Sequence, residues 1–101
     1  MKEVFLSETV RKMILVDTVD KVKDFVAIAN KCDCDIDVVS GRHVINATSI
    51  MGMFSLSLSE PVELRIYDAE KAPEILEKFE DYIIDQEPPA IENPYEKAVI
   101  L

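Results

Sequence analysis

The stretch TSIMGMFSL, from Thr48 to Leu56, places a serine at the mouth of a short apolar segment. Serine is among the residues that best cap a helix N-terminus, because its side-chain oxygen accepts a hydrogen bond from an unpaired backbone N–H. The stretch therefore predicts a helix from Ile50 to about Leu56, with Ser49 as its cap. A glycine inside a helix costs about 1 kcal/mol relative to alanine. We interpret Gly52 as a position that permits close backbone packing.

Upstream of this stretch, the chain predicts a strand followed by a helix. The segment from Val10 to Val16 is rich in β-branched and apolar residues, as strands are. Asp17 or Thr18 can cap the helix, and Asp20 near its first turn suits the positive end of the helix dipole. One apolar face recurs at helical spacing through Val22, Phe25, Val26 and Ala29.

In the next segment the apolar residues recur with a period of two, which is typical of strands, and a turn inside it predicts a hairpin. Acidic and apolar residues alternate from Asp33 to Val38, so we expect a half-buried strand. Ser40 to Arg42 forms a tight turn, and Val44 begins the return strand.

Beyond the quoted stretch, Pro61 opens a strand from Val62 to Tyr67, again with a period of two. Pro73 suits the first turn of a last helix, whose apolar face comprises Ile75, Leu76, Phe79, Tyr82 and Ile83. Asp85 to Pro89 is a linker-like break that cannot continue this helix.

The element order is therefore β-α-β-β-α-β-α, which predicts one α+β domain. We expect an open-faced sandwich: a four-stranded antiparallel sheet with three helices on one face and the acidic faces of its strands toward solvent. The chain divides into an N-terminal extension (1–9), the domain (10–84) and a C-terminal tail (85–101).

This order and the motif S-I-M-G-x-x-S-L, which starts at Ser49, resemble the HPr family, the phosphocarriers of the bacterial sugar phosphotransferase system. The resemblance covers roughly Val10 to Ile84. It is densest from Ala29 to Leu58, where A-x-K before the second strand and the hairpin glycine also match. It implies the HPr fold and protein partners, and it does not imply an enzyme.

HPr proteins carry phosphate on a histidine, in a motif G-[ILV]-H-A-R-P-A that leads into the first helix. If no gap is placed, Thr18 falls in the histidine column and Asp20 in the arginine column, where a carboxylate would repel phosphate. The alternative is a shortened loop, and neither alignment supplies a histidine. Imidazole is a good nucleophile near neutral pH, but the one histidine of the chain, His43, lies beside the hairpin turn. There we expect an exposed turn residue. We therefore expect no phosphohistidine activity and rank a true phosphocarrier as the least favoured function.

The resemblance also implies a regulatory role for Ser49. In the family, the corresponding serine is phosphorylated by a dedicated kinase, and the product binds a transcription regulator. Phosphoserine brings about −1.5 to −2 charges, and Ile50, Met51 and Phe54 would be the apolar partner-binding residues beside it. An alternative remains open: Ser49 is a cap only, and the three apolar residues are core and packing residues. Thr48 replaces the basic residue that often precedes the serine, which weakens the regulatory interpretation.

Composition excludes several classes of function. The net charge of −9 over 101 residues argues against nucleic acid and anionic membrane surfaces. No apolar run approaches the roughly 20 residues of a membrane span. The N-terminus does not read as a signal peptide, so we expect a cytoplasmic protein. Cys32 and Cys34 are expected as buried or half-buried free thiols, and with one histidine they fall short of a zinc ligand set. We expect no metal or cofactor.

Two short apolar segments lie outside the HPr-like region, Val4-Phe5-Leu6 and Ala98-Val99-Ile100-Leu101. They can pair with each other, cover a sheet edge or dock on another subunit. Our leading hypothesis is a regulatory protein-binding module, with an HPr kinase or a transcription regulator as partner. The second hypothesis is a structural or self-associating domain, a homo-oligomer that uses these segments.

Overall fold

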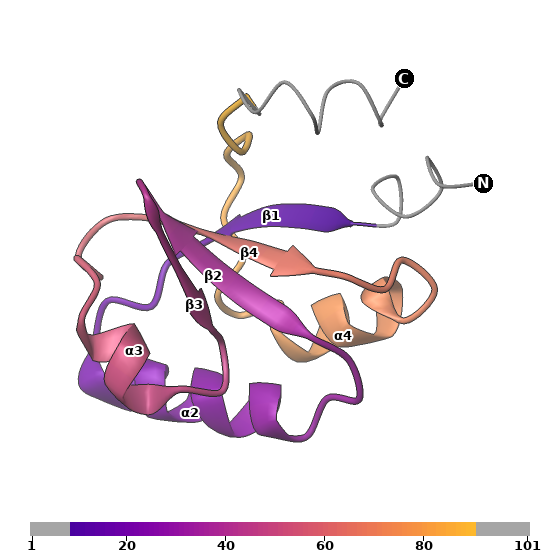
Figure 1. The fold of residues 1–101 in the computed structure, drawn as a ribbon, viewed down its shortest axis with the longest axis horizontal. Coiled ribbons are helices and arrows are strands. Elements are labelled where there is room, and N and C mark those ends of the chain that lie inside the picture. Colours follow the sequence, from indigo (N-terminus) through magenta and orange to yellow (C-terminus); the bar gives the residue numbers. More distant parts are fainter. Residues whose placement is uncertain (1–8, 91–101) are drawn as a thin grey trace.

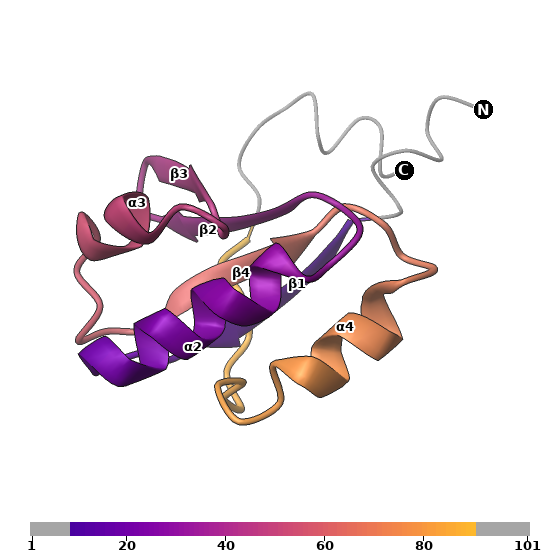
Figure 2. The ribbon, with the colours of Figure 1, turned by 90° about the horizontal axis from the view of Figure 1, so that it is seen from below.

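A computed structural model describes residues 9–90 of the chain, and its strands form a four-stranded antiparallel sheet in the order β1-β4-β2-β3. Within these residues, three helices pack below one face of the sheet (Figures 1 and 2). The predicted α+β open-faced sandwich is therefore confirmed. The strands are β1 (Val10–Ile14), β2 (Ile36–Ser40), β3 (His43–Asn46) and β4 (Val62–Ile66); the helices are α2 (Val19–Asn30), α3 (Ile50–Phe54) and α4 (Ala72–Lys78).

Local signals set the start of α2 and the β2–β3 turn. Thr18 is the N-cap of α2, and its hydroxyl oxygen accepts a hydrogen bond from the Lys21 N–H at 3.1 Å. Gly41 has a φ of +60° in the turn, a conformation that glycine adopts without the Cβ penalty of other residues. The turn places Ser40 opposite His43 and so fixes the register of the hairpin.

The second strand begins later than the alternating pattern predicts. Cys34 lies in the loop before β2, whose first residue is Ile36. The chain is not yet extended after α2, because the Lys31 and Cys32 N–H groups still donate to the Ile28 and Ala29 carbonyls. Part of the acidic alternation therefore belongs to a loop.

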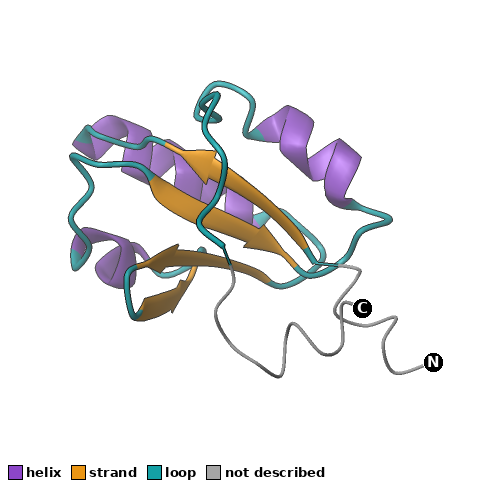
Figure 3. Cartoon of the chain, turned by 90° about the horizontal axis from the view of Figure 1, so that it is seen from above, coloured by secondary structure: helices purple, strands orange, loops and turns teal. Residues whose placement is uncertain are grey.

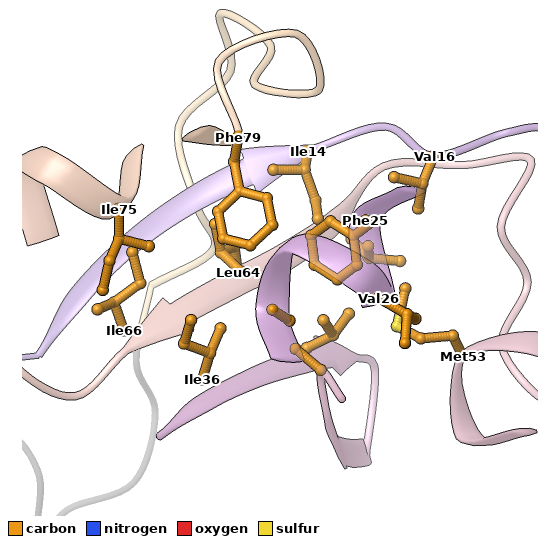
Figure 4. Packing of buried hydrophobic residues seen from close by; sticks show 14 of the residues in the cluster. Ile14, Val16, Phe25, Val26, Ile36, Met53, Leu64, Ile66, Ile75 and Phe79 are labelled. Atoms are coloured by element: carbon orange, nitrogen blue, oxygen red, sulfur yellow. The ribbon is translucent and has the colours of Figure 1, made fainter. Parts of the chain in front are cut away.

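One apolar core fills the space between the sheet and the helices (Figure 4). Phe25 of α2 and Phe79, just beyond α4, have no exposed surface, and their ring centroids lie 4.8 Å apart. The predicted face of α2 is buried as expected. The core cluster comprises Ile14, Val16, Val22, Phe25, Val26, Ala29, Ile36, Val38, Ala47, Met53, Val62, Leu64, Ile66, Ala72, Ile75 and Phe79.

The last helix is shorter than its apolar pattern predicts. It ends at Lys78, so Tyr82 and Ile83 lie beyond it rather than on its face. The backbone there pairs with the outer edge of β1: the Leu15 N–H donates to the Tyr82 carbonyl at 2.8 Å, and Ile83 bridges to Ile14. The N–H groups of Tyr82 and Ile83 donate to the Phe79 and Glu80 carbonyls, three residues back, so turns replace the helix before the chain meets β1.

One acidic residue of the sheet is not exposed to solvent, contrary to the prediction for the strand faces. Glu63 of β4 is only 4% exposed. Its carboxylate accepts hydrogen bonds from the Nε atoms of Arg11 and Arg65, each at 2.6 Å, and from Arg11 Nη2 at 3.1 Å. Burying a carboxylate requires such partners, and the two arginines satisfy this one.

We expect the stability of the protein to fall in acid because of Glu63. Burial alone would raise its pKa, but the hydrogen bonds and charges of Arg11 and Arg65 outweigh burial and hold the pKa below its usual 4.5. The folded state therefore binds fewer protons than the unfolded state. The stabilisation is complete above pH 4.5 and is lost as pH falls through the lowered pKa.

Urea unfolding of the wild type and of Glu63→Gln across pH 3 to 7 measures this effect. The difference in unfolding free energy between the two proteins should shrink toward low pH. A constant difference would show that the charge of Glu63 does not contribute.

Candidate functional site

The candidate site is built around Ser49 at the N-terminus of α3. The Ser49 side-chain oxygen accepts a hydrogen bond from the Gly52 N–H at 3.0 Å, and its carbonyl accepts one from the Met53 N–H at 2.9 Å. The predicted cap is confirmed. The helix ends at Phe54 rather than near Leu56, because the N–H of Ser55 already bonds back to the Gly52 carbonyl.

Gly52 leaves little space between its Cα and the capping side chain. A Cβ at this position would lie 2.9 Å from the Ser49 hydroxyl oxygen and 3.4 Å from Cδ1 of Ile45. The close approach therefore involves two side chains, not backbone packing as the sequence suggested. Any larger residue at position 52 would press on the hydroxyl group that caps the helix.

A second polar residue, which the sequence reasoning missed, holds the chain just before the cap. The Asn46 side-chain oxygen accepts hydrogen bonds from the Thr48 N–H at 2.9 Å and the Thr48 hydroxyl at 2.7 Å. Asparagine commonly bonds the backbone two residues further along in such turns. The N-x-T spacing was the signal that could have identified it.

The apolar residues of α3 point outward. Ile50 is 38%, Met51 81% and Phe54 45% exposed, whereas Met53 is fully buried. None of the three belongs to the core cluster, so the part of the alternative that placed them in the core is wrong. We call these three residues the α3 patch.

Helix α3 lies beside the N-terminal part of α2 (Figure 1). Val19, in the first turn of α2, is 57% exposed. An exposed valine thus lies at the helix end that neighbours the α3 patch.

The positions that align with the phosphocarrier motif lie at that same end of α2. Thr18 uses its hydroxyl oxygen as the helix cap, and Asp20 is exposed in the first turn. Asp17 pairs with Lys21 at 3.0 Å, and this hydrogen bond lowers the pKa of Asp17. Two carboxylates therefore lie close to the N-terminus of α2, where a phosphate would be repelled.

His43 lies elsewhere in the fold. It is the first residue of β3, exposed beside the turn that joins β2 to β3. The prediction of an exposed turn histidine is confirmed. The imidazole therefore does not stand at the first turn of α2.

The two cysteines are half-buried free thiols, as predicted. Burial raises the pKa of Cys32 and of Cys34, which disfavours the reactive thiolate. Both line a shallow depression that extends to Asn46 and Thr48. Across residues 9–90, His, Cys, Asp and Glu side chains form no cluster of three that could hold a metal ion. No helix in that range is long and apolar enough to cross a membrane.

Comparison with known proteins adds a family and a fold. Residues 21–85 match the family model described as "PTS HPr component phosphorylation site"; the match includes Ser49 and begins after Thr18 and Asp20. The phosphocarrier protein HPr from Bacillus anthracis str. Ames is 26% identical, with a TM-score of 0.61, over 75% of this chain and 98% of that one. HPr-C-His from Thermoanaerobacter tengcongensis is 28% identical, with a TM-score of 0.59, over 72% and 86%. A search of curated proteins gave no match.

Proposed function

This chain belongs to the HPr family, and we propose that it acts as a regulatory protein-binding module rather than as a phosphohistidine carrier. The observation that carries the proposal is the α3 patch beside the capping serine. Three large apolar side chains exposed together on one short helix are typical of a surface that contacts another protein. In this proposal the protein works in the cytoplasm and catalyses no reaction itself.

The region around α2 supports the proposal that the chain is not a phosphohistidine carrier. A phosphocarrier needs a nucleophile at the N-terminus of the helix and positive charge to hold the phosphoryl group. Thr18 offers a hydroxyl group that already caps the helix, and the nearby acids Asp17 and Asp20 oppose phosphate. His43, the nitrogen nucleophile of the chain, belongs to the hairpin.

Ser49 supports the proposal that the chain is a regulatory protein-binding module. Phosphorylation would move the γ-phosphoryl group of ATP to the serine oxygen, with ADP as the leaving group and loss of the hydroxyl proton. The new charge would lie beside the Gly52 N–H and the exposed Ile50 and Met51. A partner protein would then bind the phosphate group and the apolar surface together. The chain already carries a net charge of −9, so a regulator with a basic face would be favoured.

Incubation with ATP and HPr kinase tests this proposal. We expect the wild type to be labelled at Ser49 and Ser49→Asn to be unlabelled. Asparagine is chosen because it also caps helices well, so loss of labelling does not reflect a frayed α3. Ser57→Ala, which removes an exposed serine a few residues away, is the matched control and should be labelled like the wild type.

Three results would contradict the proposal. Absence of label from all three proteins would remove kinase control, and label retained by Ser49→Asn would move it to another residue. Labelling from phosphoenolpyruvate and the first enzyme of the phosphotransferase system would instead restore the phosphocarrier function.

Self-association remains the alternative prediction. Its segments, Val4-Phe5-Leu6 and Ala98-Val99-Ile100-Leu101, lie outside the described residues. Gel filtration over a hundredfold range of concentration tests it, and a monomer throughout would exclude it.

A further inference from the structure

The sheet face away from the helices carries a row of side chains across all four strands. The register aligns Met13 of β1 with Glu63 of β4, Glu63 with Val39 of β2, and Val39 with Val44 of β3. Their sequence neighbours Ile14, Val62, Leu64 and Val38 lie in the core. Because successive strand residues point to opposite faces, this transverse row lies on the open face.

Burial changes sharply along the transverse row. At the β1–β4 end, Met13 is 5% and Glu63 4% exposed, although the helices lie on the other side and Met13 is not part of the core cluster. At the β3 end, Val44 is 55% exposed. One end of the open face is therefore covered, and the other presents apolar surface.

The chain that follows α4 covers the buried end. The Ile84 N–H donates to the Met13 carbonyl at 3.0 Å, which ties this segment to the free edge of β1. Further along, the guanidinium group of Arg11 donates to the Pro89 carbonyl. Figure 3 shows the loop after α4 crossing the strands on the side away from the helices. The family match ends at residue 85, so residues 86–90 of this segment lie beyond it.

We propose that the C-terminus continues this path, with Ala98–Leu101 docked on the exposed β3 end of the transverse row, against Val39 and Val44. Eleven residues follow Ala90, and an extended chain spans at most about 3.3 Å per residue, or about 36 Å. The distance from β1 to β3 is three strand spacings, about 14 Å. The segment is therefore long enough, and its apolar end matches the surface that remains uncovered.

The open face is thus an intramolecular binding surface whose ligand is the chain's own C-terminus. The C-terminus is a better candidate than the N-terminal extension because the segment after α4 already lies on the open face. It is a better candidate than a second copy because its covalent link to that segment gives it a high effective concentration at the surface.

Nuclear magnetic resonance on the full chain tests the inference. We expect nuclear Overhauser effects between the methyl groups of Val44 and those of Val99, Ile100 or Leu101. Ile100→Asp should abolish them and shift the Val39 and Val44 methyl signals. Val4→Asp is the matched control at the other terminus and should leave these signals in place.

Three results would overturn the proposal. The first is unchanged Val39 and Val44 signals in Ile100→Asp. The second is a shift in Val4→Asp instead, which would assign the surface to the N-terminal extension. The third is an Overhauser effect seen only between labelled and unlabelled copies in a mixed sample, which would assign it to a second molecule.

Discussion

Replacing Phe79 by alanine lowers the free energy of unfolding by about 3–5 kcal/mol, the range found when a buried phenylalanine is truncated. The side chain of Phe79 has no exposed surface and packs against the ring of Phe25 with a centroid distance of 4.8 Å. Truncation removes this contact and leaves a cavity between α2, α4 and the sheet. The free energy of unfolding of domains of this size is roughly 5–15 kcal/mol. The expected loss is therefore a large fraction of the stability of the protein.

Urea unfolding followed by circular dichroism measures this loss. Phe54→Ala is the matched control, because it removes the same side chain from the α3 patch, where 45% of the residue is exposed. We expect that control to lose less than about 1 kcal/mol, as surface substitutions do. Equal losses in the two variants would contradict the core described for Phe79.

Replacing Glu63 by alanine should cost about 2 kcal/mol. Removing one partner of a fully buried ion pair costs about 3–5 kcal/mol, because the other charge is left without compensation. Here the Arg11 and Arg65 side chains keep 20% of their surface exposed, so water can solvate part of the charge that remains. The expected loss is therefore smaller than for a pair in the deep core.

Two variants make this prediction specific. Glu63→Gln keeps the shape of the side chain and removes its charge, so it should lose less than Glu63→Ala. Glu60→Ala removes an exposed acid two residues before β4 and should change the unfolding free energy by less than about 0.5 kcal/mol. If Glu63→Ala behaves like Glu60→Ala, the two arginines are adequately solvated without their partner.

Parts of the candidate site could be predicted from the sequence because they depend on near neighbours. The Ser49 cap needs the N–H of Gly52, three residues away, and the Thr18 cap needs the N–H of Lys21. The outward direction of the α3 patch was implied by the resemblance to the HPr family and not by the local pattern. A five-residue helix has too few positions for its apolar period to show which side faces the core.

The sequence by itself determined the order of the elements, the helix caps and the buried face of α2, because hydrogen bonds and periodicity within a few residues decide them. Only the tertiary structure decided that the chain after α4 pairs with β1, that Glu63 is buried and that the segment after α4 crosses the open face. Each of these depends on β1, a strand distant in the chain: Arg11 and Glu63 are 52 positions apart. Such contacts form only when the sheet assembles, so no local pattern encodes them.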